Sequence, residues 1–478
     1  MLFNSFSFAI FLPIVFLLYW FATGGKYKLQ NILLLVASYY FYGCWDWRFL
    51  FLLIFSTGLD YFTGLKMADA RDNKWKKFWF WLSVCINLGF LGVFKYYNFF
   101  ISSFAEGLTH AGIHAHYSTL KVILPVGISF YTFHGLSYVI DIYNDRIKPE
   151  RNFINYSVFV CFFPLLVAGP IERATHLLPQ ITRKRKFDYH KAVDGCRQIL
   201  WGLFKKIVIA DNCASYVNDI FNNYHTQTGS TLLIGAIFFA FQIYGDFSGY
   251  SDIAIGTARL FGIELLRNFA YPYFSRDIAE FWRRWHISLT TWFRDYLYIP
   301  LGGSRGGKWK AIRNTFIIFL VSGFWHGANW TFIVWGFFHA LLFLPLLLLQ
   351  KNRKNTDLIA DGRWLPSSKE MFQMFMTFQL VVLGWIFFRA NTISDAFNYF
   401  HGMIQWGTFR ASYRLLDYKE FWFILILLFV EWFQREKKYG LDLSLIKSPV
   451  VRRLIYFLII GMIVMFTGKN ETFIYFQF

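Results

Sequence analysis

Hydrophobic and polar positions along this chain alternate in long blocks. Apolar runs, many of about seventeen residues or more, recur from residues 6–22 to residues 454–467, and short polar loops separate them. A run of that length can cross the hydrocarbon core of a bilayer as one helix. The pattern therefore predicts an all-α, polytopic membrane protein with about 11–12 transmembrane helices, plus re-entrant and interfacial helices around a central cavity.

One apolar segment, residues 154–170, interrupts the simple alternation of crossings. It is long enough to cross, yet basic residues flank it on both sides, and basic loops belong on the cytoplasmic side. We therefore expect it to enter the membrane and return, with a break at Gly169-Pro170. Non-helical backbone at membrane depth must be buried or line a cavity, so this segment predicts a cavity on the cytoplasmic side.

A second unusual segment, residues 280–297, predicts an amphipathic helix at the membrane edge. If the segment is one helix, spacings of three and four place four residues on a polar face: Arg283, His286, Thr290 and Arg294. Bulky aromatic and aliphatic residues form the other side. Arginines on such a face can bind lipid phosphates or the phosphates of a nucleotide-linked ligand, and the sequence leaves both interpretations open.

The charge of the loops predicts the orientation of the chain. Residues 66–77 and 264–314 are basic, the latter with nine Lys or Arg against four acidic residues, whereas residues 98–120 contain neither Lys nor Arg. By the positive-inside rule the first two face the cytoplasm and the third faces outward. The net charge of +19 thus reflects short inner loops beside membrane lipids and does not indicate a nucleic-acid partner. Lys205 and Lys206 are exceptions, because they fall inside a predicted span.

Composition indicates one membrane-embedded domain and excludes several kinds of site. With 56% hydrophobic and 22% aromatic residues, the chain is too apolar for a soluble globule. We expect one domain over residues 1–478, with a catalytic core at about 121–349 and C-terminal helices at 371–467. The five cysteines have neither metal-ligand nor disulfide spacing, so no metal site is expected. The sequence also has no phosphate-binding P-loop, HExxH zinc motif or G-x-S-x-G serine elbow.

His326 is the strongest candidate for proton transfer. It lies in the apolar segment GFWHGANWTFIVWGFFHA (323–340), where a polar side chain is costly, and His exchanges a proton near neutral pH. Its neighbours Trp325 and Asn329 could shape a pocket and orient a substrate, although Asn329 could equally cap the next helix. For His326 itself the alternative is a core histidine bonded to a neighbouring helix.

Polar residues also interrupt the predicted span at 231–256. Asp246 and Ser248 lie there among glycines, and carboxylates inside membranes often mark functional sites. A hydrogen-bonded packing hinge explains them equally well. Two further histidines, His134 and His339, are expected to be structural or to line a chamber.

Long strings in the chain resemble a known family. They are RDIAEFWRRWHISLTTWFRDYLYIPLGG (276–303), WHGANWTF (325–332), QIYGDFSGYSDIAIG (242–256), LPVGISFYTFHGLSYVIDIY (124–143), AGPIERATHLLPQI (168–181) and the final FIYFQF (473–478). Together they extend over nearly the whole chain, and they resemble the membrane-bound O-acyltransferase superfamily. Within it the likeness is to the bacterial alginate O-acetyltransferase branch, which also includes peptidoglycan O-acetyltransferases.

The resemblance implies an acetyltransferase of a bacterial plasma (inner) membrane. Such an enzyme moves an acetyl group from cytoplasmic acetyl-CoA across the membrane for O-acetylation of an extracytoplasmic polysaccharide. The family's catalytic histidine corresponds to His326, and its second histidine to His286. The resemblance further implies acetyl-CoA as donor with no bound cofactor, and a separate extracytoplasmic acetyltransferase as partner.

Two alternatives stay open at the level of sequence. A sister branch of the superfamily transfers D-alanine from a carrier-bound thioester to teichoic acid, and the sequence does not exclude such a carrier here. From a different class, a polysaccharide or small-molecule transporter would also have broken helices and polar groups at the membrane midplane. The sequence has no visible internal repeat of the kind many transporters have, which favours the enzyme.

Overall fold

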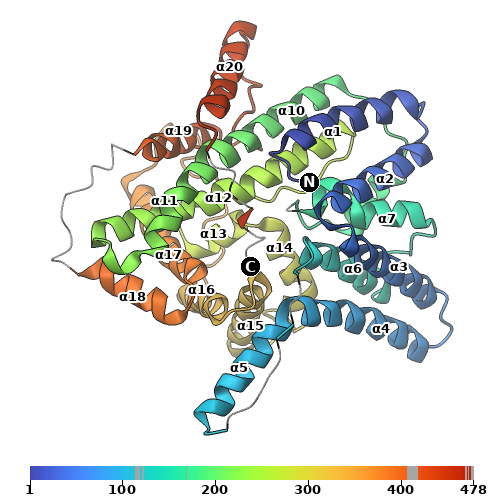
Figure 1. The fold of residues 1–478 in the computed structure, drawn as a ribbon, viewed down its shortest axis with the longest axis horizontal. Coiled ribbons are helices and arrows are strands. Elements are labelled where there is room, and N and C mark those ends of the chain that lie inside the picture. Colours follow the sequence, from blue (N-terminus) through green and yellow to red (C-terminus); the bar gives the residue numbers. More distant parts are fainter. Residues whose placement is uncertain are drawn as a thin grey trace. The chain divides into compact units, whose positions relative to one another are not determined.

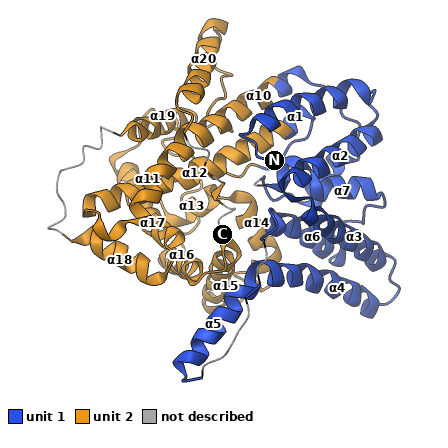
Figure 2. Cartoon of the chain, in the orientation of Figure 1, with its two compact units in different colours: residues 1–192, 258–266 blue, residues 193–257, 267–478 orange. Residues whose placement is uncertain are grey.

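The computed structural model describes residues 1–113, 119–120, 123–167, 169–405, 418–468, 471 and 473–474. All regular elements in these residues are helices, so the prediction of an all-α protein is confirmed (Figure 1). The chain divides into two compact units (Figure 2). Unit 1 comprises Met1–Ala192 and Ala258–Leu266, and unit 2 comprises Val193–Thr257 and Arg267–Phe478.

Unit 1 is built from helices of the first part of the chain. They are α1 (Phe6–Leu17), α2 (Tyr27–Asp46), α3 (Arg48–Ala68), α4 (Asn73–Leu91), α5 (Tyr97–His110), α6 (Ile128–Tyr143), α7 (Phe153–Cys161), α8 (Phe163–Leu166), α9 (Ala174–Ile181) and the first residues of α10 (Tyr189–Leu203). Polar caps fix several starts. The Asp72 side chain accepts a hydrogen bond from Lys74 N at the start of α4, for example.

Unit 2 holds the candidate site. Its elements are the rest of α10, the π-helical turn η3 (Phe204–Ala210), α11 (Asp211–Asn222), most of α12 (Gly229–Leu260), α13 (Ile278–Arg284), α14 (Ile287–Phe293), α15 (Lys308–His326), α16 (Trp330–Leu348), α17 (Ser368–Arg389), α18 (Ile393–Ile404), α19 (Lys419–Phe433) and α20 (Pro449–Met465). A capping box of Ser367 and Glu370 starts α17, because each side chain accepts a main-chain N–H of the other.

Several helices have the length and composition of membrane spans. Among the described residues there are five: Arg48–Ala68, Asn73–His110, Gly229–Leu260, Trp330–Leu348 and Ser368–Arg389. A shorter apolar stretch, Phe6–Ala22, precedes them. The protein is therefore a multi-pass membrane protein. The larger number of spans expected from hydropathy, and the side of the membrane that each loop faces, stay predictions.

Two predicted segment ends differ from the structure. The helix that starts at Asn73 continues through a π-helical turn to His110, although an outer loop was expected from residue 98; residues 114–118 of that loop lie outside the described part. The segment at 154–170 breaks at Phe162, ahead of the expected Gly169-Pro170.

The early break at Phe162 has a local cause. Phe163 N donates to Ser38 Oγ at 3.0 Å, and Pro164 has no N–H, so two successive helical hydrogen bonds are missing. The helices on either side have 9 and 4 residues, too few to cross a bilayer. That the segment enters the membrane and returns stays a prediction.

Two features of unit 2 position its chemistry. The first is α12, whose most apolar 18-residue window is 83% buried, the largest share among the five candidate spans of the described residues. The second is the close pairing of α15 with α16. A Cβ added at Gly323 would lie 2.2 Å from Phe332 O, and one at Gly336 would lie 2.2 Å from Phe319 O. Glycine thus lets the two backbones touch and fixes the end of α15, where His326 lies.

Candidate active site

His286 lies at a break between two short helices. Helix α13 ends at Arg284, Trp285 is extended, and His286 has a left-handed backbone with φ of 44° before α14 begins. The prediction of one helix over residues 280–297 is therefore wrong, and so is the expectation that four polar residues share one helical face.

The break arises because a neighbouring segment takes the main-chain hydrogen bonds of a continuous helix. Ile287 N donates to Asn268 O at 2.9 Å, and Arg284 O accepts from Ala270 N at 3.0 Å. Ser288 N is directed to Asn268 Oδ1 at 3.4 Å. In an unbroken helix these groups would bond to each other or to the preceding turn. The pattern of apolar residues carries no sign of this competition.

The ring of His286 is enclosed by aromatic side chains. It is 1% exposed, stands edge-on to Phe247 with ring centroids 4.6 Å apart, and lies 6.0 Å from Trp325. Neither ring nitrogen has a hydrogen-bond partner among the described residues. Burial lowers the pKa of His286 to about 3, so the ring is neutral near pH 7. A neutral imidazole offers one donor and one acceptor to a ligand.

His326 approaches His286 from the end of α15. Its ring centroid is 6.4 Å from that of His286 and 4.9 Å from that of Trp325. Trp335 of α16 and Phe388 of α17 enclose it at 5.1 and 5.4 Å. The two histidines selected from the sequence therefore meet in one aromatic environment, with the Trp325 ring close to both.

The arginines expected beside His286 border a different space. Arg283, Thr290 and Arg294 line an open cavity of about 600 Å³, together with side chains of α15 and α16. His286 does not line it, because the helix break directs its ring toward Phe247. The structure thus brings the predicted cationic residues together but separates them from the histidine.

Guanidinium groups give this cavity its positive charge. Arg283 donates to the main-chain oxygens of Asn352 at 2.8 Å and Asn355 at 2.6 Å, and Arg353 also lines the cavity. Arg294 forms an exposed ion pair with the adjacent residue. Most of the remaining lining is apolar. Cationic groups beside an apolar surface suit a ligand with phosphates and an apolar arm.

Tryptophans connect the cavity wall with the histidine pair. Trp282 lines the cavity, and its ring centroid is 5.6 Å from that of Trp335. Trp335 in turn lies 5.1 Å from His326. A ligand that reaches from the cavity to His326 has to displace or pass these rings.

Asp246 and Ser248 belong to buried ion-pair networks on α12. Lys206 Nζ lies 2.9 Å from an Asp246 carboxylate oxygen and 2.6 Å from one of Asp211. Lys205 donates to Ser248 Oγ at 2.9 Å. The two lysines that the sequence placed inside a span are thus buried with polar partners. These contacts favour the interpretation of Asp246 and Ser248 as packing residues.

Asn329 and Trp325 differ in what surrounds them. Asn329 caps α16, since its Oδ1 accepts from Thr331 N at 3.0 Å and its Nδ2 donates to Asn391 O at 2.9 Å. Both amide atoms are therefore bonded to the main chain, as the capping interpretation requires. Trp325 is buried against both histidines, where it can shape a pocket.

The other two histidines have surroundings of their own. His339 is fully buried between the rings of Trp282 and Trp335, each 5.1 Å away, and its ring nitrogens have no hydrogen-bond partner among the described residues. His134, in unit 1, accepts from Glu172 N at 3.1 Å. Both surroundings fit a structural role.

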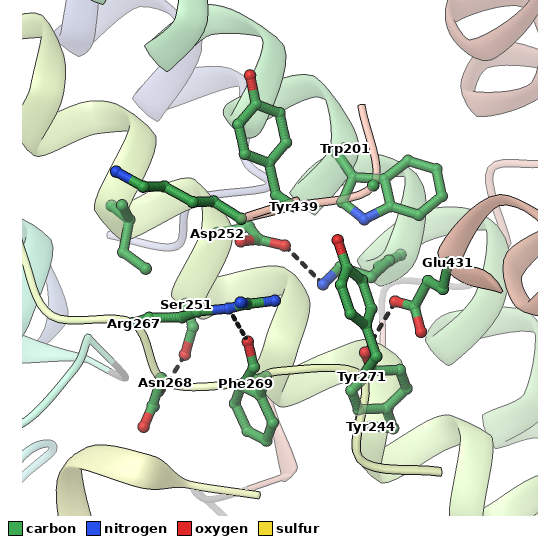
Figure 3. Close-up of a pocket in the computed structure, with 14 residues that line it drawn as sticks. Trp201, Tyr244, Ser251, Asp252, Arg267, Asn268, Phe269, Tyr271, Glu431 and Tyr439 are labelled. Carbon is green, nitrogen blue, oxygen red and sulfur yellow. Dashed lines mark hydrogen bonds and ion pairs between the residues drawn. The ribbon is translucent and has the colours of Figure 1, made fainter. Parts of the chain in front are cut away.

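A buried polar cluster beside α12 was not identified as a unit from the sequence (Figure 3). Lys205 Nζ lies 2.6 Å from Asp252, and Tyr244 donates to Glu431 at 2.8 Å. The one sequence signal for the cluster was the isolated carboxylates in apolar runs. Phe247 was also missed, since one phenylalanine among many carries no mark of its role.

Comparison with known proteins identifies the family. The model of the membrane-bound O-acyltransferase family matches residues 144–388, which include both His286 and His326. A protein named probable alginate O-acetylase AlgI from Pseudomonas aeruginosa is 40% identical over 86% of this chain and 75% of its own length. The chain belongs to the membrane-bound O-acyltransferase family.

Two further relatives place this family member more closely. Peptidoglycan O-acetyltransferase from Helicobacter pylori is 35% identical over 84% of this chain and 80% of its own length. Teichoic acid D-alanyltransferase from Bacillus subtilis is 27% identical over 61% of this chain and 75% of its own length. The resemblance to the alginate O-acetyltransferase-like branch is confirmed. The protein is an O-acyltransferase, which favours the enzyme over the transporter.

Proposed function

We propose that this enzyme takes an acetyl group from cytoplasmic acetyl-CoA and delivers it across the inner membrane for O-acetylation of a cell-surface polysaccharide. The observation that carries the proposal is the histidine pair: two buried imidazoles with ring centroids 6.4 Å apart in an aromatic environment. Acetyl as the transferred group, and a polysaccharide as the final acceptor, are supported by the names of the alginate and peptidoglycan relatives.

His326 is the proposed general base. It takes the proton of the acceptor hydroxyl while the hydroxyl oxygen attacks the thioester carbonyl carbon. The new C–O bond forms, the C–S bond breaks, and the imidazolium returns the proton to the sulfur of CoA. His286, neutral because burial lowers its pKa to about 3, donates an N–H to the carbonyl oxygen, where negative charge develops. Thioester and hydroxyl become ester and thiol, and the proton count balances.

The donor is proposed to enter through the cavity lined by Arg283 and Arg294. Guanidinium groups bind phosphate oxygens in pairs, and the apolar walls accept the pantetheine arm. Because neither histidine lines this cavity, the thioester end has to move past Trp282. The competing interpretation is that both arginines bind lipid phosphates.

The direction of transfer rests on residues 264–314 facing the cytoplasm, as their charge predicts. Trp309 offers a test, because its side chain is 83% exposed. With the exposed cysteines Cys44, Cys85 and Cys196 replaced by serine, a Trp309→Cys variant should react with a membrane-impermeant thiol reagent only when the cytoplasmic face is open to it. Labelling from the outer face of intact cells would reverse the direction. On the outer side we propose a separate acetyltransferase that passes the acetyl group to the polymer.

Purified protein with radiolabelled acetyl-CoA tests the donor. We expect acetyl transfer and release of free CoA, both lost in His326→Ala. The main alternative is a carrier-bound thioester, favoured by the 27% identity to a teichoic acid D-alanyltransferase. Activity with an acylated carrier protein and none with acetyl-CoA would establish that alternative instead.

A further inference from the structure

The His286 turn is held from one side by a short hydrogen-bonded path that the proposed chemistry does not use. Asn268 lies in the segment between α12 and α13, is fully buried, and bonds to α12 and α14. Its Oδ1 accepts from Ser288 Oγ at 2.9 Å, two residues after His286, and its Nδ2 donates to Ser251 Oγ of α12 at 3.1 Å. Figure 3 shows the second of these bonds.

A main-chain hydrogen bond of Asn268 also stabilises the His286 turn. Asn268 O accepts from Ile287 N at 2.9 Å, so side chain and main chain of one residue bond to both residues that follow His286. His286 itself has φ of 44°, a conformation that is unfavourable for a residue with a Cβ. Such a backbone conformation persists only where neighbouring groups stabilise it, and here the hydrogen bonds of Asn268 do so.

Helix α12 contacts the His286 ring directly through Phe247, and it reaches the following backbone indirectly through Ser251 and Asn268. Phe247 and Ser251 are four residues apart, which places them one above the other on a helix. Phe247 stands against the His286 ring at 4.6 Å, while Ser251 bonds the Asn268 side chain that holds the following backbone. Contacts with the same buried helix therefore fix both the ring of His286 and the backbone that follows it.

We propose that Asn268 is a positioning residue, which holds the His286 turn against α12 so that the imidazole faces His326. The inference rests on the proposed role of His286 in acetyl transfer. Both atoms of its side-chain amide are bonded to serine hydroxyls, so Asn268 acts on the reaction through geometry. A displacement of reacting groups by about an ångström can lower turnover on the order of 100-fold while leaving donor binding intact.

The test measures turnover and the Michaelis constant for acetyl-CoA in Asn268→Ala. We expect kcat to fall about 10- to 100-fold, with the Michaelis constant within about twofold of wild type. Ser288→Ala, which removes one bond of the path, should give a smaller loss in the same direction. Ser288→Thr keeps the hydroxyl and should recover most of it. The matched control is Asn31→Ala in unit 1, another buried asparagine whose side chain bonds two segments; its kcat per folded molecule should stay at the wild-type level.

A double variant separates positioning from stability. In a His286→Ala background, Asn268→Ala should reduce kcat no further, because the residue that it positions is gone. An additional loss of the full single-variant size, or a wild-type kcat per folded molecule in both Asn268→Ala and Ser288→Ala, would overturn the positioning role. Wild-type turnover in His286→Ala alone has a different meaning: it would remove the role of His286 in the proposed function, and with it the basis of this inference.

Discussion

Two buried groups of polar side chains in unit 2 make a direct comparison. Around α12, Lys205 and Lys206 are almost inaccessible, and each has a carboxylate within 2.6 Å. His286 is equally buried, yet neither of its ring nitrogens has a hydrogen-bond partner among the described residues. Because the three side chains are almost equally buried, burial does not explain why the lysines have partners and His286 has none; the chemistry of the groups does.

The comparison distinguishes two kinds of buried group. Groups paired with a partner stabilise the fold, whereas groups without one, called available groups here, can bond a ligand. A buried lysine has to be paired, because an isolated buried charge is far more costly than the ion pair. A neutral imidazole can be buried unpaired at a cost of about 1–3 kcal/mol, and it then keeps its donor and acceptor for a ligand. On this basis the two lysines of η3 hold the helices together, whereas His286, whose ring lies 6.4 Å from that of His326, is kept free for reaction. Each prediction below would weaken or refine that distinction.

The largest effect is expected at the available group. His326→Ala and His286→Ala should each lower acetyl transfer, His326→Ala by roughly three orders of magnitude, because proton transfer and oxyanion stabilisation are each worth about 100-fold or more. His339→Ala is the matched control, a buried histidine beside tryptophans with no part in the proposed chemistry. The measurement is acetyl transfer per folded molecule in membrane vesicles, compared among the three variants. Equal losses in all three variants would mean that burial, and not chemistry, explains these histidines.

Removal of a paired lysine should instead destabilise the fold. Lys206→Ala leaves Asp211 and Asp246 buried without their cation, and breaking such a pair costs about 3–5 kcal/mol. Lys191, whose ion pair with Glu264 is largely exposed, is the control, and its replacement by alanine should cost less than about 1 kcal/mol. Thermal unfolding in detergent compares the two. If Lys206→Ala kept wild-type stability but lost activity, the lysine would belong with the available groups.

The pH dependence of stability sharpens the comparison further. Burial lowers the pKa of His286 to about 3, so between that value and its ordinary pKa the unfolded chain binds a proton that the folded chain does not. Stability from this group is therefore complete above about pH 6.5 and is lost as the pH falls, by about 2 kcal/mol at most between pH 7 and pH 5. His286→Phe should flatten the curve by that amount in unfolding measured at both pH values. Parallel curves for variant and wild type would mean that the pKa of His286 is the same in the folded and the unfolded chain, so that burial does not keep its ring neutral.

The sequence anticipated this division only in part. His326 could be selected because an ionisable residue in an apolar run is conspicuous, and His286 because of the family resemblance and its place among arginines; the helical class follows from hydropathy. The arrangement of His286 could not, because its helix break depends on Asn268, which approaches from a separate segment. Periodicity assumes that local hydrogen bonds are made within the helix, and here a neighbouring segment takes them. Lys205 and Lys206 illustrate the same limit, since each also pairs with a carboxylate of α12, about 40 residues further along the chain.

The cavity arginines combine features of the two kinds of buried group, since they have partners but can still bind a ligand. The smallest effect is expected for them. Arg283 is bonded to two main-chain oxygens and to no carboxylate among the described residues, so its charge can still bind an anion. Replacing Arg283 and Arg294 by alanine together should raise the Michaelis constant for acetyl-CoA about tenfold with little change in kcat, because contacts to a remote phosphate stabilise ground and transition states alike.

Arg435 is a close control: its guanidinium also donates to main-chain oxygens, but it does not line the cavity. Arg435→Ala should leave the Michaelis constant unchanged. If the double variant did the same, lipid phosphates would be the better assignment for Arg283 and Arg294, and the donor would have to enter elsewhere.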